Sequence, residues 1–368
     1  MADIDVLDAS VFLYLEDLIE EDLFYMLVKE CEDTAPVFPY WKYDRFSLES
    51  MLEDECLSEF RVSKTDIHRL VRVLQIPDDI ICENGTKACA LEGLCILLKR
   101  FAYPCRYSDL IPRFGRSKPE LCLICNEVMR FVVGSHGYLL TSFDQEWLRA
   151  NKLQEYASAV YEKSHALGNC WGFVDGTVRA ICRPEKNQKT VYNGHKRVHA
   201  LKYQSVIAAN GLIANLFGPI EGKSHDAGIL RRSDLLNNLE AYCNSEDGEP
   251  LCIYGDSAYP QRMHLQTPYK HIDLTDDEKA FNKAMSKVRV SVECIFGEIA
   301  GYFAFVDFKK NQKIGLQQVG TMYTTCALLR NAITCLYGST TGTYFNLDPP
   351  SLEQYFQFDR EFDDIHNQ

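Results

Sequence analysis

The spacing of apolar residues divides the chain into a helical first part and a strand-rich second part. From Phe60 to about Gly137, apolar residues recur with the period of amphipathic helices. From Cys170 onward the pattern changes to short apolar runs rich in β-branched and aromatic residues, which are typical of strands. We therefore expect an all-α region followed by an α/β domain.

The helical part contains a candidate helix-turn-helix. Ser63 and Ser117 are each followed three residues later by an acid, a pattern that favours a helix start. Residues 106–132 then indicate a helix, a turn at Gly115 and a second helix, the outline of a DNA-reading motif. Cations near this turn are candidates for phosphate contacts: Arg113, Arg116 and Lys118. The alternative is a helical bundle that packs on the second half.

The second half predicts a mixed sheet. Strand candidates are residues 170–184, 199–211, 212–220 and 250–260. Asn210-Gly211 is a strong hairpin signal between the second and third of these. Helix candidates are residues 225–242 and about 275–297. The order of elements is thus three strands, a helix, a strand and a helix.

Three carboxylates fall at positions that this sheet brings together. Asp175 is expected to end the first strand and Asp256 the fourth, while Glu293 lies on the late helix. If the first and fourth strands are neighbours, both aspartates lie side by side and a crossing helix supplies the glutamate. Hard oxygen ligands of this kind bind Mg²⁺ or Mn²⁺. Two such ions activate a water and stabilise the leaving 3′ oxygen in phosphodiester cleavage.

The net charge of −13 for the whole chain argues against a protein that binds nucleic acid. Counting the charges by segment changes this picture. Residues 1–60 hold 17 acids and the bases Lys29, Lys42 and Arg45, a net of −14. The remainder holds 52 − 17 = 35 acids and 39 − 3 = 36 bases, a net of +1. The acidity therefore belongs to the N-terminal segment, where residues 11–28 predict an amphipathic helix that packs on the next region.

Membrane insertion and secretion are not expected. The longest apolar runs fall short of the roughly 18 to 20 residues of a membrane span, and the first residues lack a signal-peptide pattern. The 15 cysteines are an odd number spread over the whole chain, so we interpret them as reduced thiols.

Five strings within this strand-rich half are more specific than any single residue. In order they are VDGTVRAI, NGHKRVHALKYQ, GKSHDAGI, GDSAYP and VRVSVECIFGEI. Together they resemble the PIF/Harbinger transposases and the nucleases derived from them, over roughly residues 168–335. The resemblance implies an RNase H-like fold with a DDE metal triad of Asp175, Asp256 and Glu293. It also implies a helix-turn-helix in the preceding helical half, and makes Asp226 an accessory metal-site candidate.

Further cations near the expected triad are candidates for holding DNA. They are Lys196, Arg197, Lys202, Lys287 and Arg289. A solvated hairpin face is the alternative for the first three. Beyond the last carboxylate, the chain has Cys294, Glu298 and Ala300 where the family commonly has basic or aromatic residues, which lowers the expected phosphate affinity there.

The expected function is a DDE-type DNA endonuclease that uses Mg²⁺ or Mn²⁺, with two ions, and that transfers strands if it acts as a transposase. The alternative is a domesticated, catalytically inactive DNA- or chromatin-binding protein. DNA is the expected partner, a separate Myb-like DNA-binding protein and a homo-oligomer are open possibilities, and no membrane is expected. With a DNA substrate we expect the nucleus, and the cytoplasm as well, as the location.

The expected organisation has five parts. Residues 1–58 are an acidic helical segment, 59–140 the helix-turn-helix-like region and 141–167 a connecting helix. Residues 168–338 are the RNase H-like domain, and 339–368 are an acidic tail.

Overall fold

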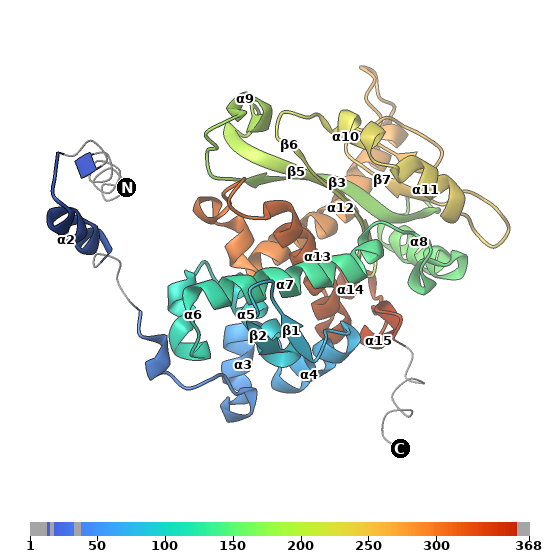
Figure 1. Ribbon diagram of the computed structural model, residues 1–368. Coiled ribbons are helices and arrows are strands. Elements are labelled where there is room, and N and C mark those ends of the chain that lie inside the picture. The colour runs from blue at the N-terminus through green and yellow to red at the C-terminus, as the bar shows by residue number, and fades with distance from the viewer. Residues whose placement is uncertain (1–12, 15–17, 33–37, 359–368) are drawn as a thin grey trace.

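The computed structural model describes residues 13–14, 18–32 and 38–358, without the side chains of 28–32 and 291–294. Figure 1 shows helices packed around one sheet, with helix α2 (Glu21–Glu32) standing apart from the body. The expected helix over residues 11–28 is interrupted at Leu18–Glu20, and α2 begins only at Glu21. Leu23, Tyr25 and Met26 are exposed on α2, so the expected packing of this segment on the next region is not seen for them.

The sheet is mixed and has the order β4-β5-β3-β7-β8, with β6 also paired to β5. Its strands are β3 (Cys170–Ala180), β4 (Tyr192–Asn193), β5 (Val198–Ala208), β6 (Ile213–Glu221), β7 (Cys252–Tyr254) and β8 (Leu265–Gln266). β3, β5 and β6 form an antiparallel meander, of which the sequence predicted the three strands and the hairpin between the last two. β7 pairs in parallel with both β3 and β8. This α/β arrangement is consistent with the RNase H-like fold expected from the sequence.

The hairpin between β5 and β6 turns where the sequence predicted. Gly211 has a φ of +87°, a conformation that glycine adopts without strain. Its amide donates to the carbonyl of Ala208, and Ile207 pairs with Ile213 across the turn. The sequence did not reveal the two short strands β4 and β8, which have only two residues each.

Helices flank the sheet and supply its hydrophobic cover. α8 (Ala150–Ser164) packs against β3, and α12 (Asp276–Tyr302) packs against α8 and α13 (Val319–Tyr337). α12 begins at Thr275, whose hydroxyl accepts from the amide of Glu278 in a capping box. The single helix predicted over 225–242 is instead two, α10 (Asp226–Arg232) and α11 (Leu235–Tyr242).

The N-terminal half is helical, as predicted. Its helices are α3 (Glu53–Phe60), α4 (Lys64–Val73), α5 (Ala90–Ala102), α6 (Tyr107–Phe114) and α7 (Lys118–His136). Ser63 and Ser117 cap α4 and α7 as expected from the sequence. A small hairpin of β1 (Asp79–Ile81) and β2 (Lys87–Cys89) interrupts the series and was not predicted.

The expected helix-turn-helix is not confirmed as a DNA-reading unit. α6 and α7 do flank a turn, where Gly115 has a φ of +57°. However, α7 packs against both α5 and α13, which buries Leu121, Ile124 and Val128. This face of α7 packs as in a helical bundle, whereas Arg130 on the same helix is exposed, so DNA reading by α7 stays a prediction.

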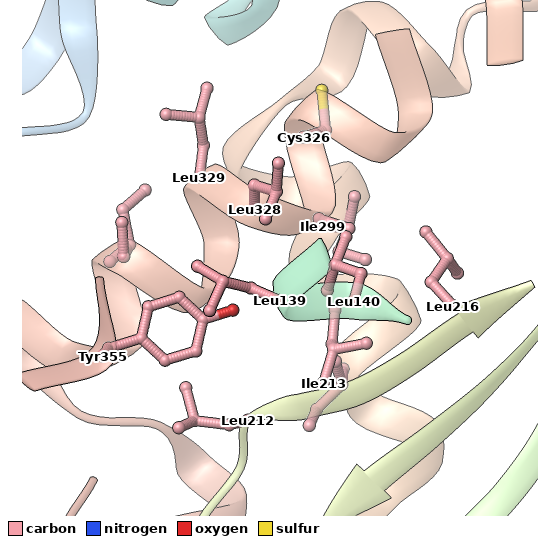
Figure 2. Close-up of a cluster of buried hydrophobic side chains, with 14 of the residues drawn as sticks. Leu139, Leu140, Leu212, Ile213, Leu216, Ile299, Cys326, Leu328, Leu329 and Tyr355 are labelled. Atoms are coloured by element: carbon pink, nitrogen blue, oxygen red, sulfur yellow. The ribbon is translucent and has the colours of Figure 1, made fainter. Parts of the chain in front are cut away.

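The helical half and the sheet share one hydrophobic core. Figure 2 shows Leu139 and Leu140, which follow α7, lying against Ile213 of β6 and Leu328 of α13. Asn331 of α13 ties the same region together, since its side chain bonds both backbone groups of Ile213.

The C-terminal segment also joins this core. Residues 339–358 of the expected acidic tail fold back as α14 (Thr340–Phe345) and α15 (Leu352–Tyr355). Phe345, Leu352 and Tyr355 are buried there. The acids in this segment led to the prediction of a tail, although its apolar residues pack these two short helices on the core. Within the described residues, no helix is both long and apolar enough to cross a membrane.

Candidate functional site

Strand pairing brings Asp175 and Asp256 to neighbouring positions. β3 and β7 run parallel, with Gly172 opposite Ile253 and Phe173 opposite Tyr254. Continuing this register by two residues sets Asp175 beside Asp256. The prediction that the first and fourth strands are neighbours is therefore confirmed.

Asp175 does not end its strand, contrary to the prediction. β3 continues to Ala180 and stays paired to β5, where Asp175 is opposite Ser205. β7, by contrast, stops at Tyr254. Asp175 therefore lies at the point where β3 loses its neighbour on the β7 side, which opens one flank of the carboxylate. The sequence missed this because residues 176–180 remain strand-like while only the partner ends.

The carboxylate of Asp175 is held by its own strand and by helix α12. Its Oδ1 atom accepts from the amide of Gly176 at 2.9 Å. The same oxygen lies 3.7 Å from Nη1 of Arg289, and each of these two side chains is 22% exposed. A neighbouring guanidinium stabilises the ionised form of a partly buried carboxylate. α12 thus supplies a cation directly to the first carboxylate of the predicted triad.

Asp256 is fixed by a tight turn after β7. Its Oδ1 atom accepts from the amide of Ala258 at 2.9 Å, the pattern of an Asx turn. A side chain on the preceding Gly255 would meet Val174 Cγ1 at 2.8 Å and Tyr259 Cδ2 at 3.0 Å. The glycine therefore lets the turn pack directly on β3, which sets the position of Asp256.

Glu293, the third predicted ligand, lies on α12 one turn after Arg289. Its side chain is outside the described residues, so its place beside the two aspartates stays a prediction. Among the side chains that the structure does describe, no cluster of three or more His, Cys, Asp or Glu forms a metal site.

Asp226 approaches the same region from the other face of β3. Its Oδ1 atom lies 2.6 Å from Nζ of Lys202. A Cβ atom added to Gly176 would lie 2.8 Å from the same oxygen. Because neighbouring residues of a strand point to opposite faces, Asp226 and Asp175 lie on opposite sides of the sheet. The accessory metal role of Asp226 stays a prediction. What the structure shows is an ion pair with Lys202, whose side chain is 7% exposed.

Sequence reasoning gave no role to Tyr259, although it lies within the GDSAYP string. Its ring is 1% exposed, and its hydroxyl has no hydrogen-bond partner in the described part of the protein. Burial raises the pKa of Tyr259 well above its usual value, and the charges of Asp226, Asp175 and Asp256 raise it further. All three carboxylates therefore lie near enough to this hydroxyl to disfavour its ionised form.

The donor set fits a hard divalent cation. Asp175 and Asp256 offer carboxylate oxygens at adjacent positions, and both side chains are partly open to solvent. Hard oxygen donors of this kind suit Mg²⁺ or Mn²⁺.

The cations expected to bind DNA from the helical half have other partners. Arg113 pairs with Glu55 and Glu59. Arg116 forms a buried double hydrogen bond with Glu92, at 2.6 and 2.7 Å. Lys118 lies 4.1 Å above the ring of Phe38.

The cations expected from the second half divide into two groups. Lys202 and Arg289 are engaged with Asp226 and Asp175. Lys196, Arg197 and Lys287 are exposed to solvent. The exposed group remains available for phosphate contacts, whereas Arg113, Arg116 and Lys202 already stabilise the fold.

A comparison with known proteins identifies the sheet region. Residues 174–331, less than half of the chain, match the family model of the DDE superfamily endonucleases. The match begins one residue before Asp175 and includes Asp256 and Glu293. No curated protein and no solved structure gives a match to the chain.

Proposed function

We propose that the protein is a divalent-metal-dependent DNA nuclease, because residues 174–331 match the family model of the DDE superfamily endonucleases. Asp175, Asp256 and Glu293 are the proposed metal ligands. The observation that carries the proposal is the parallel register of β3 and β7, which brings two carboxylates from distant parts of the chain together.

Each ligand would hold the metal from a different element. Asp175 is fixed by β3, Asp256 by the turn after β7, and Glu293 by α12, so the site depends on the packing of all three. When bound, Mg²⁺ or Mn²⁺ supplies Lewis-acid stabilisation of phosphate oxygens and lowers the pKa of a coordinated water. The rigid carboxylates orient the group being cleaved and need no covalent attachment to it.

Arg289 has a second proposed role at this site. In the free protein its guanidinium partly neutralises Asp175. With a metal held by this carboxylate, the guanidinium of Arg289 would be able to donate two bonds to a phosphate of the substrate. The domain would then act on DNA in the nucleus, with strand transfer if the 3′ end attacks a second duplex, as in the PIF/Harbinger transposases that the sequence resembles.

Plasmid cleavage tests this proposal. Supercoiled DNA is incubated with the wild type in Mg²⁺, Mn²⁺ or EDTA, and with Asp256→Asn in the same metals. Asp247→Asn is the matched control, because Asp247 is an exposed acid in a turn of the same domain. We expect cleavage by the wild type and the control in either metal, and none by Asp256→Asn. Equal cleavage by Asp256→Asn refutes the assignment, and DNA binding without cleavage by the wild type supports the inactive DNA-binding alternative.

A further inference from the structure

Three separate segments bring exposed cations to the outer edge of the sheet, beyond β5. They are the segment between β3 and β5, the loop after β6 and the segment before α13. Their exposed cations are Arg183, Lys186, Lys189, Lys196 and Arg197 from the first, Lys223 from the second, and Lys309, Lys310 and Lys313 from the third. We call these residues the sheet-edge cations.

Backbone contacts fix the three segments to one another. Lys223 donates its amide to the carbonyl of Thr190, and Asn193 donates its side-chain amide to the carbonyl of Gly222 at 2.8 Å. Cys182 donates its amide to the carbonyl of Gln312 at 2.9 Å, which joins the third segment to the first.

A small apolar cluster lies beneath these contacts. It consists of Ile181, Val191 and Val319, with Leu201 packed against it. Cations that are far apart in the sequence are therefore held on one built surface.

The charge of this surface is not neutralised within the fold. In the described part of the chain, none of the sheet-edge cations has an acidic partner, whereas Lys64, Lys99 and Arg113 of the helical half all do. The nearby acids Glu221 and Asp307 are instead paired with Arg232 and Arg179. Residues 183–197 alone carry five cations and one acid, a net of 5 − 1 = +4. Clustered cations without acidic partners are the electrostatic signature of phosphate binding.

β3 sets the distance between this surface and the carboxylates. The strand runs from Asp175 to Ala180, and the chain continues directly to Arg183. At about 3.3 Å per residue, eight residues of extended chain span at most about 26 Å. Duplex DNA rises about 3.4 Å per base pair, so this upper limit corresponds to about eight base pairs.

We propose that the sheet-edge cations bind the phosphate backbone of duplex DNA, beginning within about eight base pairs of the bond cleaved at Asp175 and Asp256. This inference rests on the proposed nuclease function, because it takes the carboxylate pair as the place of cleavage. Of the cations that the sequence offers as DNA contacts, it uses Lys196 and Arg197 and does not need those near the turn between α6 and α7.

DNA binding by the full chain tests the proposal without any cleavage. Fluorescence anisotropy with a 30-base-pair duplex is measured in EDTA over a range of salt concentrations. The test variant is Lys189→Gln/Lys196→Gln/Arg197→Gln. The matched control is Arg149→Gln/Lys152→Gln/Lys163→Gln, which removes the same charge from positions in and beside α8, where Arg149 and Lys152 are exposed and Lys163 is partly buried. Thermal unfolding of both variants verifies that the fold is retained.

Each lost phosphate contact lowers the slope of log K against log[salt] by about 0.9. We therefore expect the test variant to lose about two to three in slope and to bind roughly 100- to 500-fold more weakly at 0.1 M salt. The control is expected to keep the wild-type slope. An unchanged slope in the test variant, or an equal loss in the control, overturns the proposal.

Combining this assay with plasmid cleavage separates the two proposals. If no metal supports cleavage but the test variant still loses its salt slope, the surface stands and the nuclease function fails. If the wild type cleaves DNA and the test variant binds as tightly as the wild type, the nuclease function stands and the surface fails. A duplex that ends at the cleaved bond should also bind the wild type more weakly than one that extends more than about eight base pairs beyond it.

Discussion

Nζ of Lys202 lies 2.6 Å from Oδ1 of Asp226, and this ion pair holds the carboxylate over the backbone of β3 at Gly176. The amine also donates to the carbonyl of Ser224 at 3.1 Å. The pair thereby attaches the N-terminus of α10 to β5, one strand away from Asp175. The geometry behind the candidate metal site therefore depends on a contact that contains neither of the two central aspartates.

The first prediction follows from this contact. Lys202→Met leaves Asp226 without its counter-charge, and we expect the free energy of unfolding to fall by about 1 to 3 kcal/mol. The double variant Lys202→Met/Asp226→Asn should recover part of that loss, because no charge is then left unpaired. Urea denaturation of both variants measures the difference. Equal stability of the wild type and the single variant would show that the pair does not support the fold.

The second prediction concerns the glycine beneath Asp226. A Cβ at residue 176 would lie 2.8 Å from the Asp226 carboxylate, so Gly176→Ala must displace the ion pair with Lys202. We expect a loss of about 1 kcal/mol or more, as for other disturbed buried contacts.

Gly134→Ala is the matched control, because Gly134 lies in α7 with no atom within 4 Å of the added methyl group. The control should gain about 0.5 to 1 kcal/mol from helix propensity. A loss in both variants, measured by thermal unfolding, would contradict this explanation.

Much of the sheet could be predicted from the sequence because its signals are local. The strands around Phe173 and Val206 are apolar runs, and Asn210-Gly211 indicates the turn that follows the second of them. The adjacency of Asp175 and Asp256 followed from one assumption about strand order. The continuation of β3 past Asp175 could not be predicted, since it depends on where the partner strand β7 ends.

Which of the candidate cations stay unpaired could not be predicted, for a different reason. The sequence shows that Arg113 and Arg116 are cations near a turn, but their acidic partners Glu55 and Glu92 lie far from them in the sequence. Tertiary packing decides which charges are neutralised and which stay exposed. The same holds for Cys182 and Gln312, whose contact no local pattern indicates.

The third prediction tests the structural role of Arg116. Arg116 and Glu92 are 9% and 10% exposed. Glu92→Gln removes the nearer counter-charge of this guanidinium and leaves only Glu120, whose Oε1 lies 3.5 Å from Nη1 of Arg116. We expect a loss of about 3 kcal/mol or more in the free energy of unfolding. Arg130→Gln breaks the exposed pair with Glu127 and should cost at most about 1 kcal/mol. Guanidinium denaturation compares the two, and similar small losses would mean that Arg116 is free to act elsewhere.

The fourth prediction is a pH dependence of stability at the end of α7. His136 is 4% exposed, its Nε2 atom lies 2.9 Å from the carbonyl of Leu74, and burial lowers its pKa from 6.5. Between that lowered pKa and 6.5, the unfolded chain binds more protons than the folded protein. This contribution to stability is therefore complete above about pH 6.5 and is lost as the pH falls.

His136→Gln removes the titration while keeping a side-chain amide. We expect the variant to lose less stability than the wild type between pH 7 and pH 5, as measured by urea denaturation at each pH. Parallel pH curves for the two proteins would show that His136 is not the responsible group.

The central claim is that Asp175 and Asp256 together hold a divalent metal ion. Mn²⁺ uptake tests it most directly, by the loss of the electron paramagnetic resonance signal of the free ion as protein is added. The wild type and Asp247→Asn should bind Mn²⁺ with the same affinity, and Asp175→Asn/Asp256→Asn should leave the free-ion signal unchanged. Equal Mn²⁺ binding by the double variant and the wild type would contradict the assignment of this site.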